Sequence, residues 1–186
     1  MHDIEPYFKW RDYYVASEDD KSPFHGRTYN EFQFTQKIYN YFIHPQWDFI
    51  GSPTLYIKIL YVDYIKGFAI IELIGEWNDA VHNDIMFLKR EIADYLISAG
   101  IYRFVLLCDN VLNFHGDDDS YYEEWYDDVK DEDGWIALVN LREHMYQEMS
   151  DMKLEYYIRM DDEIADLEWR RHMPDALYKL ISKELD

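Results

Sequence analysis

An uninterrupted apolar run, Phe104 to Cys108, constrains the fold of this chain more than any other feature of its sequence. A strand with water on one face alternates apolar and polar residues, whereas a strand covered on both faces is apolar throughout. The run therefore predicts a central strand over residues 102–108, in a sheet with chain packed on both faces. Such strands are typical of parallel pairing in α/β proteins.

The segment before this strand predicts a β-hairpin followed by a helix. Residues 54–65 and 68–74 are rich in Ile, Tyr and Val, and Gly67 between them accepts the positive φ of a tight turn. Asn78 is placed to cap a helix that Gly100 ends. An apolar stripe at three- and four-residue spacing runs along this helix. The stripe consists of Val81, Ile85, Leu88, Ile92, Leu96 and Ala99.

The segment after the central strand continues the alternation of helices and strands. Asn140 and Glu143 form a capping-box-like pattern, and Pro174 is acceptable in the first turn of a helix. The expected elements are a helix over 120–130, a strand over 135–139, a helix from Asn140, an edge strand over 154–158 and a helix over 161–185 that is interrupted near Pro174.

This order of elements predicts an α/β fold in which a mixed central sheet, made of an N-terminal β-hairpin plus parallel strands, is flanked by helices. We expect a single domain over residues 1–186. Within it, residues 1–53 form an N-terminal elaboration, residues 54–152 the α/β core, and residues 153–186 a C-terminal strand and helical extension. The aromatic stretch from Glu31 to Ile43 favours a strand inside the elaboration.

Charge and composition restrict the possible partners. The 186 residues include 38 Asp and Glu against 18 Lys and Arg, which gives a net charge of −20. This charge disfavours nucleic acid and anionic membranes, which need basic patches. It favours a basic protein partner or a cation, with simple solubility as the alternative. The 18 Tyr residues suit half-buried faces and partner surfaces.

Cysteine usage and hydropathy favour the cytoplasm. Cys108 is the one Cys of the chain, so no internal disulfide can form, and its position predicts a buried, inert thiol. The first ten residues lack the apolar run of a signal peptide. No stretch reaches the roughly 18 apolar residues that cross a bilayer. We therefore expect a soluble cytoplasmic protein.

Ten acidic residues crowd the segment 117–133, directly after the expected central strand. Strand ends are where α/β proteins usually place their working surfaces. We expect this segment to contact a protein partner, although a solvated helix face is the alternative. Ser120 with Glu123 also predicts a capping box, in which Ser120 is the N-cap. The candidate contact residues are Asp117, Asp119, Ser120, Glu124, Asp127 and Asp128.

A calcium site in the acidic segment matches the sequence less well. Residues 130–134 are similar to the middle of an EF-hand loop. The first ligand position of that loop falls on Val129, and the twelfth falls on Asn140, where a bidentate Glu belongs. We therefore expect no metal site and no cofactor.

The element order resembles that of the SpoIIAA-like STAS domains, in which a β-hairpin precedes three helices that alternate with two strands. The resemblance covers residues 54–152. Phe104-Val105-Leu106-Leu107, then Phe114-His115-Gly116 and an acidic helix start, look like the segment after the third strand of that family. In its anti-sigma factor antagonist branch, a phosphorylatable Ser in an Asp-Ser pair opens this helix, and Asp119-Ser120 stands at that place. The family continues with a small residue and Gly, where this chain has Tyr121-Tyr122-Glu123. The resemblance implies binding or regulation rather than catalysis.

A catalytic function is the alternative. A carboxylate can orient His as a general base, and His115 lies near Asp117 and Asp119, as His82 lies near Asp79 and Asp84. Trp77 and Trp125 could line a pocket with these His residues, or they could belong to the core. The chain contains no GxSxG, HExxH, Walker or GxGxxG motif.

These observations predict a non-enzymatic cytoplasmic module that regulates or binds another protein through an acidic, aromatic surface. The alternative is a small enzyme or ligand-binding protein that uses His115 with its neighbouring carboxylates. The alternative pocket would contain His82, His115, Trp77 and Trp125.

Overall fold

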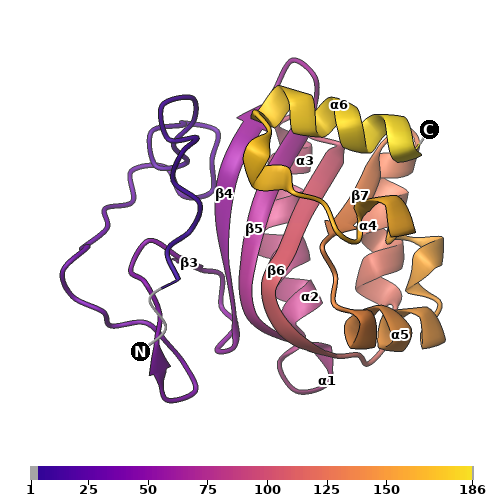
Figure 1. The fold of residues 1–186 in the computed structure, drawn as a ribbon, viewed down its shortest axis with the longest axis horizontal. Coiled ribbons are helices and arrows are strands. Elements are labelled where there is room, and N and C mark those ends of the chain that lie inside the picture. Colours follow the sequence, from indigo (N-terminus) through magenta and orange to yellow (C-terminus); the bar gives the residue numbers. More distant parts are fainter. Residues whose placement is uncertain (1–3, 186) are drawn as a thin grey trace.

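The computed structural model describes residues 4–185, and a five-stranded sheet in the order β3-β4-β5-β6-β7 forms its centre (Figure 1). Strands β3, β4 and β5 pair antiparallel, whereas β5, β6 and β7 pair in parallel. The predicted mixed sheet of a hairpin plus parallel strands is confirmed. The strands are β3 (Asp48–Phe49), β4 (Leu55–Asp63), β5 (Phe68–Asn78), β6 (Arg103–His115) and β7 (Trp135–Val139).

Two of the strands are longer than their local sequence predicts. β5 continues to Asn78 and β6 continues to His115, where these two residues pair in register. The extension of β6 includes a bulge, because Glu72 pairs with Leu107 whereas Ile74 pairs with Asn110. A bulge inserts an extra residue and re-aims the side chains beside it.

The helical segments from α1 to α5 cover one face of the sheet. They are α1 (Asp79–His82), α2 (Asp84–Phe87), the π-helical turn η1 (Leu88–Ala93), α3 (Asp94–Ser98), α4 (Ser120–Lys130) and α5 (Glu143–Asp151). The expected single helix after the hairpin is therefore wrong in its continuity. It breaks at Asn83, whose φ of 54° is left-handed, a conformation that Asn tolerates better than most residues. Asn78 does cap α1, because its side chain accepts a hydrogen bond from the Val81 amide.

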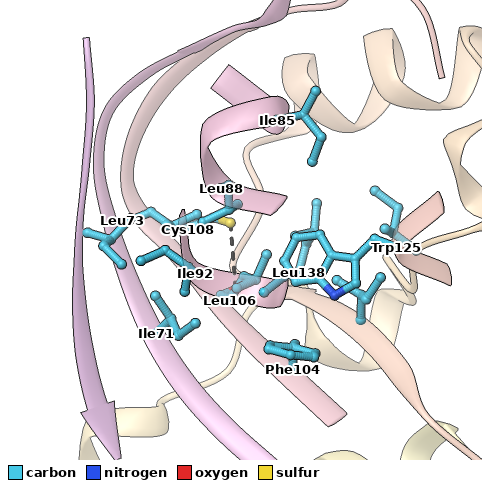
Figure 2. Close-up of a cluster of buried hydrophobic side chains, with 14 of the residues drawn as sticks. Ile71, Leu73, Ile85, Leu88, Ile92, Phe104, Leu106, Cys108, Trp125 and Leu138 are labelled. Atoms are coloured by element: carbon cyan, nitrogen blue, oxygen red, sulfur yellow. Dashed lines mark hydrogen bonds between the residues drawn. The ribbon is translucent and has the colours of Figure 1, made fainter. Parts of the chain in front are cut away.

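Buried side chains of the helices and strands interlock on this face (Figure 2). Ile85, Leu88 and Ile92 face the sheet from the crossover helices, and Trp125 faces it from α4. Phe104, Leu106 and Cys108 point toward them from β6, so the predicted burial of Cys108 is confirmed. Burial raises the pKa of the Cys108 thiol, which keeps it protonated.

The opposite face is covered by the two ends of the described chain. α6 (Pro174–Leu185) crosses this face of the sheet (Figure 1). Leu177 and Ile181 of α6, with Trp10 from the N-terminal segment, pack with Val105 and Leu107 of β6. The prediction that β6 is covered on both faces is therefore confirmed.

Three predictions for the C-terminal part are wrong. Residues 154–156 form a 3-10 turn instead of an edge strand, and only Arg159 bridges to Ala137. Asn140 does not cap α5. Its φ is 57°, and its side chain accepts the Leu167 amide, so a tertiary contact determines its conformation. The helix expected over 161–185 is wrong before its predicted interruption, where two 3-10 turns stand instead. From Pro174 onward it is confirmed, because α6 begins at that residue.

The N-terminal elaboration contains little regular structure. β1 (Lys37–Ile38) and β2 (Tyr41–Phe42) form a separate two-stranded sheet, so the strand expected within 31–43 is limited to these residues. No helix within residues 4–185 is long and apolar enough to cross a membrane.

Candidate functional site at the carboxyl end of the sheet

The acidic segment begins where β5 and β6 end side by side. Asn78 pairs with His115 at this end, and the turn from Gly116 leads into α4. The Gly116 amide donates to Glu148 Oε1 at 3.0 Å, and a Cβ at this position would overlap Met152 Sδ. The turn therefore packs closely on the Met152 side chain at the end of α5, and a larger residue at position 116 would require that side chain to move.

We name the exposed acids of this turn and of the first turn of α4, together with Ser120, the α4 acidic surface. An aromatic residue borders it, because the Tyr157 hydroxyl donates to Asp119 at 3.2 Å. The Tyr157 ring lies 6.3 Å from that of Tyr126 on α4. The α4 acidic surface consists of Asp117, Asp118, Asp119, Ser120 and Glu123, all of which are exposed.

Ser120 does not cap α4, so the predicted capping box is wrong. The helix begins at Ser120 itself, and the N-cap residue Asp119 makes no side-chain capping bond. The Ser120 hydroxyl donates to the Asp118 carboxylate, which also accepts the Ser120 amide. A local turn has therefore replaced the cap, as short polar side chains often allow.

Three predicted contact residues, Glu124, Asp127 and Asp128, form ion pairs within the molecule. Lys130, on α4 itself, donates to Asp127 at 2.6 Å. Arg90 binds Glu124 through two hydrogen bonds of 2.5 and 2.8 Å. Lys89 donates to Asp128 at 2.8 Å and also to Asp94, and its own side chain is fully buried. The ion pairs with Lys89 and Arg90 join α4 to the preceding helices. The predicted site is thereby divided into free acids at the start of α4 and paired acids along its side.

The alternative pocket is not formed as one site. Trp77 and Trp125 are buried, and the Trp77 indole donates to Asp79 Oδ1 at 3.0 Å. His115 is exposed and contacts Asn113 at 2.9 Å, whereas His82 is half-buried at the end of α1. The structure thus places the two Trp residues in the core and His115 on the surface.

A buried carboxylate network lies behind the α4 acidic surface. Asp79 accepts hydrogen bonds from the Tyr122 hydroxyl at 2.6 Å and from the Ile85 amide at 2.8 Å. Burial raises its pKa to about 7. Burial also raises the pKa of Asp84, which accepts the Asn78 amide, while the charge of nearby His82 opposes that shift. The network fixes the start of α1 and the inner side of α4 to the end of β5.

A second carboxylate network, on the opposite face, was not predicted. Glu72 is buried on β5 and accepts the Tyr7 amide at 2.8 Å, and the bulge in β6 brings Asp109 close to it. Arg170 bridges the pair, at 3.2 Å from Glu72 and 2.8 Å from Asp109. Burial raises the pKa of Glu72 to about 7. The sequence held one signal of this network, because Glu72 is a single acid inside the apolar run of residues 67–75.

Neither network is arranged as a metal centre. Within residues 4–185, no three His, Cys, Asp or Glu side chains are grouped so that they could hold a metal ion. The buried carboxylates are instead bonded to amides, phenols and indoles, which is the arrangement of groups that hold elements together.

No protein-family model and no curated protein matches this chain. Solved structures do match it in fold. An anti-sigma factor antagonist from Thermotoga maritima is 16% identical with a TM-score of 0.44, covering 67% of this chain and 92% of that one. The Bacillus cell fate determinant SpoIIAA, in its phosphorylated form, is 11% identical with a TM-score of 0.41, covering 57% and 93%. Unphosphorylated SpoIIAA is 14% identical with a TM-score of 0.39, covering 56% and 87%. Each of these matches is a likeness in fold over part of this chain.

Proposed function

We propose that this chain is a non-enzymatic regulatory module that binds a basic protein partner through the α4 acidic surface. One observation carries the proposal. The acids along the side of α4 are paired with Lys89 and Arg90, whereas those at its start face solvent without a cation bonded to them in the described chain. Acids left unpaired beside paired ones provide a local negative field for a partner.

The neighbouring phenols support the same interpretation. Tyr157 bonds to Asp119, and its ring lies beside that of Tyr126. Both residues can contribute apolar area with a polar tip. Tyr is enriched at protein interfaces for that reason. A basic partner would therefore meet charge and aromatic area on one surface, without a cavity or a reacting group.

The experiment compares two variants that lose the same charge. The site variant carries Asp117→Asn, Asp119→Asn and Glu123→Gln. The control variant carries Asp162→Asn, Glu163→Gln and Asp166→Asn, which are exposed acids of the C-terminal segment. Each immobilised protein is exposed to extract of the native cell, and the captured proteins are quantified by mass spectrometry.

We expect at least one basic protein to be captured by the wild type and by the control variant and to be lost from the site variant. Its capture should decrease as salt increases, because ions screen exposed charges over about 8 Å at physiological ionic strength. Equal loss from both variants would show a nonspecific effect of net charge. Equal capture by all three proteins would place the contact elsewhere, and either result contradicts the proposal.

A further inference from the structure

The N-terminal segment and β4 enclose a cavity of about 200 Å³ that lies apart from the α4 acidic surface. The segment that forms its outer wall runs beside the β4 edge of the sheet (Figure 1). Ile59 and Leu60 supply apolar wall from β4. Its other prominent lining residues are Tyr7, Arg11, Tyr14, Tyr29, Gln46 and Lys58.

Lys58 is the unusual member of this cavity. Its side chain is 11% exposed, and its ammonium makes a single hydrogen bond, to Asp48 Oδ2 at 3.1 Å. The ammonium also lies 3.9 Å from the centre of the Tyr29 ring. A Lys ammonium has three N–H donors, so two of them lack an acceptor within residues 4–185.

The charge around Lys58 is positive, although the chain as a whole is strongly acidic. Asp48 is shared, because Arg27 donates to its other oxygen at 2.8 Å and the Tyr29 hydroxyl does so at 2.7 Å. Arg11 is close enough that its charge, together with burial, lowers the pKa of Lys58. A single buried carboxylate thus faces two cations, and the third cation on the cavity wall, Arg11, pairs with Glu5 at 2.9 Å.

The shape of the cavity restricts what could provide the missing acceptors. Its wall combines cations at one part with Tyr rings and aliphatic side chains elsewhere. A cavity of about 150 Å³ is sufficient to hold benzene. A ligand with one ring or a short aliphatic body, and with a negative end, therefore fits both the volume and the lining.

We propose that this cavity binds a small organic acid, whose carboxylate contacts Lys58 and Arg11 and whose apolar body lies against Tyr14 and Ile59. The proposal is independent of the protein contact on α4. It gives the N-terminal elaboration a function of its own, as the outer wall of a ligand site.

The test uses the full chain, with sodium benzoate as the probe. Benzyl alcohol has the same ring without the charge, and inorganic phosphate has charge without the ring. Calorimetric titration at constant ionic strength should show saturable binding of benzoate. We expect the affinity for benzoate to exceed that for either comparison compound by about tenfold or more. Benzyl alcohol lacks the charged hydrogen-bonding group, and phosphate lacks the ring that would be buried against the apolar wall.

Arg11 and Arg171 provide a matched pair of variants. Each is an exposed Arg that pairs with a nearby Glu, but only Arg11 lines this cavity. Arg11→Gln should weaken benzoate binding severalfold, whereas Arg171→Gln should leave it unchanged. Lys58→Met should remove the preference for benzoate over benzyl alcohol. If Lys58→Met does not fold, the comparison of Arg11→Gln with Arg171→Gln decides whether the cavity binds benzoate.

Three results would overturn the proposal. One is the absence of saturable benzoate binding at millimolar concentrations. Another is equal affinity for benzoate and phosphate, which would remove the role of the apolar wall. The third is equal weakening by Arg11→Gln and Arg171→Gln, which would reduce the effect to general charge.

Discussion

At the scale of single residues, the carboxylates of this chain fall into two groups with opposite environments. Those at the start of α4 are exposed. Glu72 and Asp79 are buried, and burial raises the pKa of each to about 7. A buried acid that titrates near neutrality makes stability depend on pH, because the folded and unfolded states bind different numbers of protons.

We predict that Glu72→Gln reduces the pH dependence of stability. The folded pKa of Glu72 is about 7 against an ordinary value of 4.5, so the native state holds its proton longer. Stability is therefore lost as pH rises from about 4.5 to about 7. Between about pH 5 and pH 8, the fall in the free energy of unfolding should be about 2–3 kcal/mol smaller in the variant. Urea denaturation measures this, with exposed Glu163→Gln as the control. An unchanged fall would show that Glu72 does not titrate in this range.

Ser120 and Asn78 provide a contrasting pair of helix starts. The Asn78 side chain accepts the Val81 amide, so Asn78→Ala should cost about 1 kcal/mol. The Ser120 hydroxyl bonds only to exposed Asp118, so Ser120→Ala should change stability by less than about 0.5 kcal/mol. Chemical denaturation of the two variants measures the difference. A loss of about 1 kcal/mol for Ser120→Ala would restore Ser120 as the cap.

At the scale of secondary-structure elements, buried Lys89 joins η1 to α4. Removing its partners leaves an uncompensated buried charge, which is costly. These partners are Asp94, Asp128 and, at 3.6 Å, Glu124. We predict that Asp94→Asn, Glu124→Gln and Asp128→Asn together lower the free energy of unfolding by about 3 kcal/mol. Asp127→Asn, one position away on the exposed side, should cost less than about 0.5 kcal/mol. Equal effects would mean that Lys89 finds water or another acceptor.

The same scale shows what the sequence could predict. The hairpin, α4 and β7 follow from local apolar periodicity, and their positions are confirmed. The conformation of Asn140 could not be predicted, because its bonds to Asp109 and Leu167, distant in the sequence, determine it. The acidic segment was evident in the sequence, but its division into ion-paired and unpaired acids was not. Lys89 lies 39 residues from Asp128, and only the fold brings them together.

At the scale of the whole molecule, the N- and C-terminal segments form the second hydrophobic layer. Leu177 of α6 is fully buried against this face of the sheet. Leu177→Ala should therefore cost roughly 2–5 kcal/mol, as deletion of a buried Leu side chain does. Leu112→Ala, at an exposed position of β6, should cost less than about 0.5 kcal/mol. Thermal denaturation compares the two, and similar losses would mean that α6 packs loosely.

Both faces of the sheet are covered by packed chain, and the α4 acidic surface is the part of the molecule that we propose meets a protein partner. Its charge should therefore control how fast a partner associates. The most direct measurement is the association rate constant of a captured basic partner over a range of salt concentrations. For the wild type and the Asp162, Glu163 and Asp166 control variant, the rate should fall steeply with salt. For the Asp117, Asp119 and Glu123 site variant, it should start lower and change much less. Equal rates and equal salt dependence in all three proteins would contradict the account.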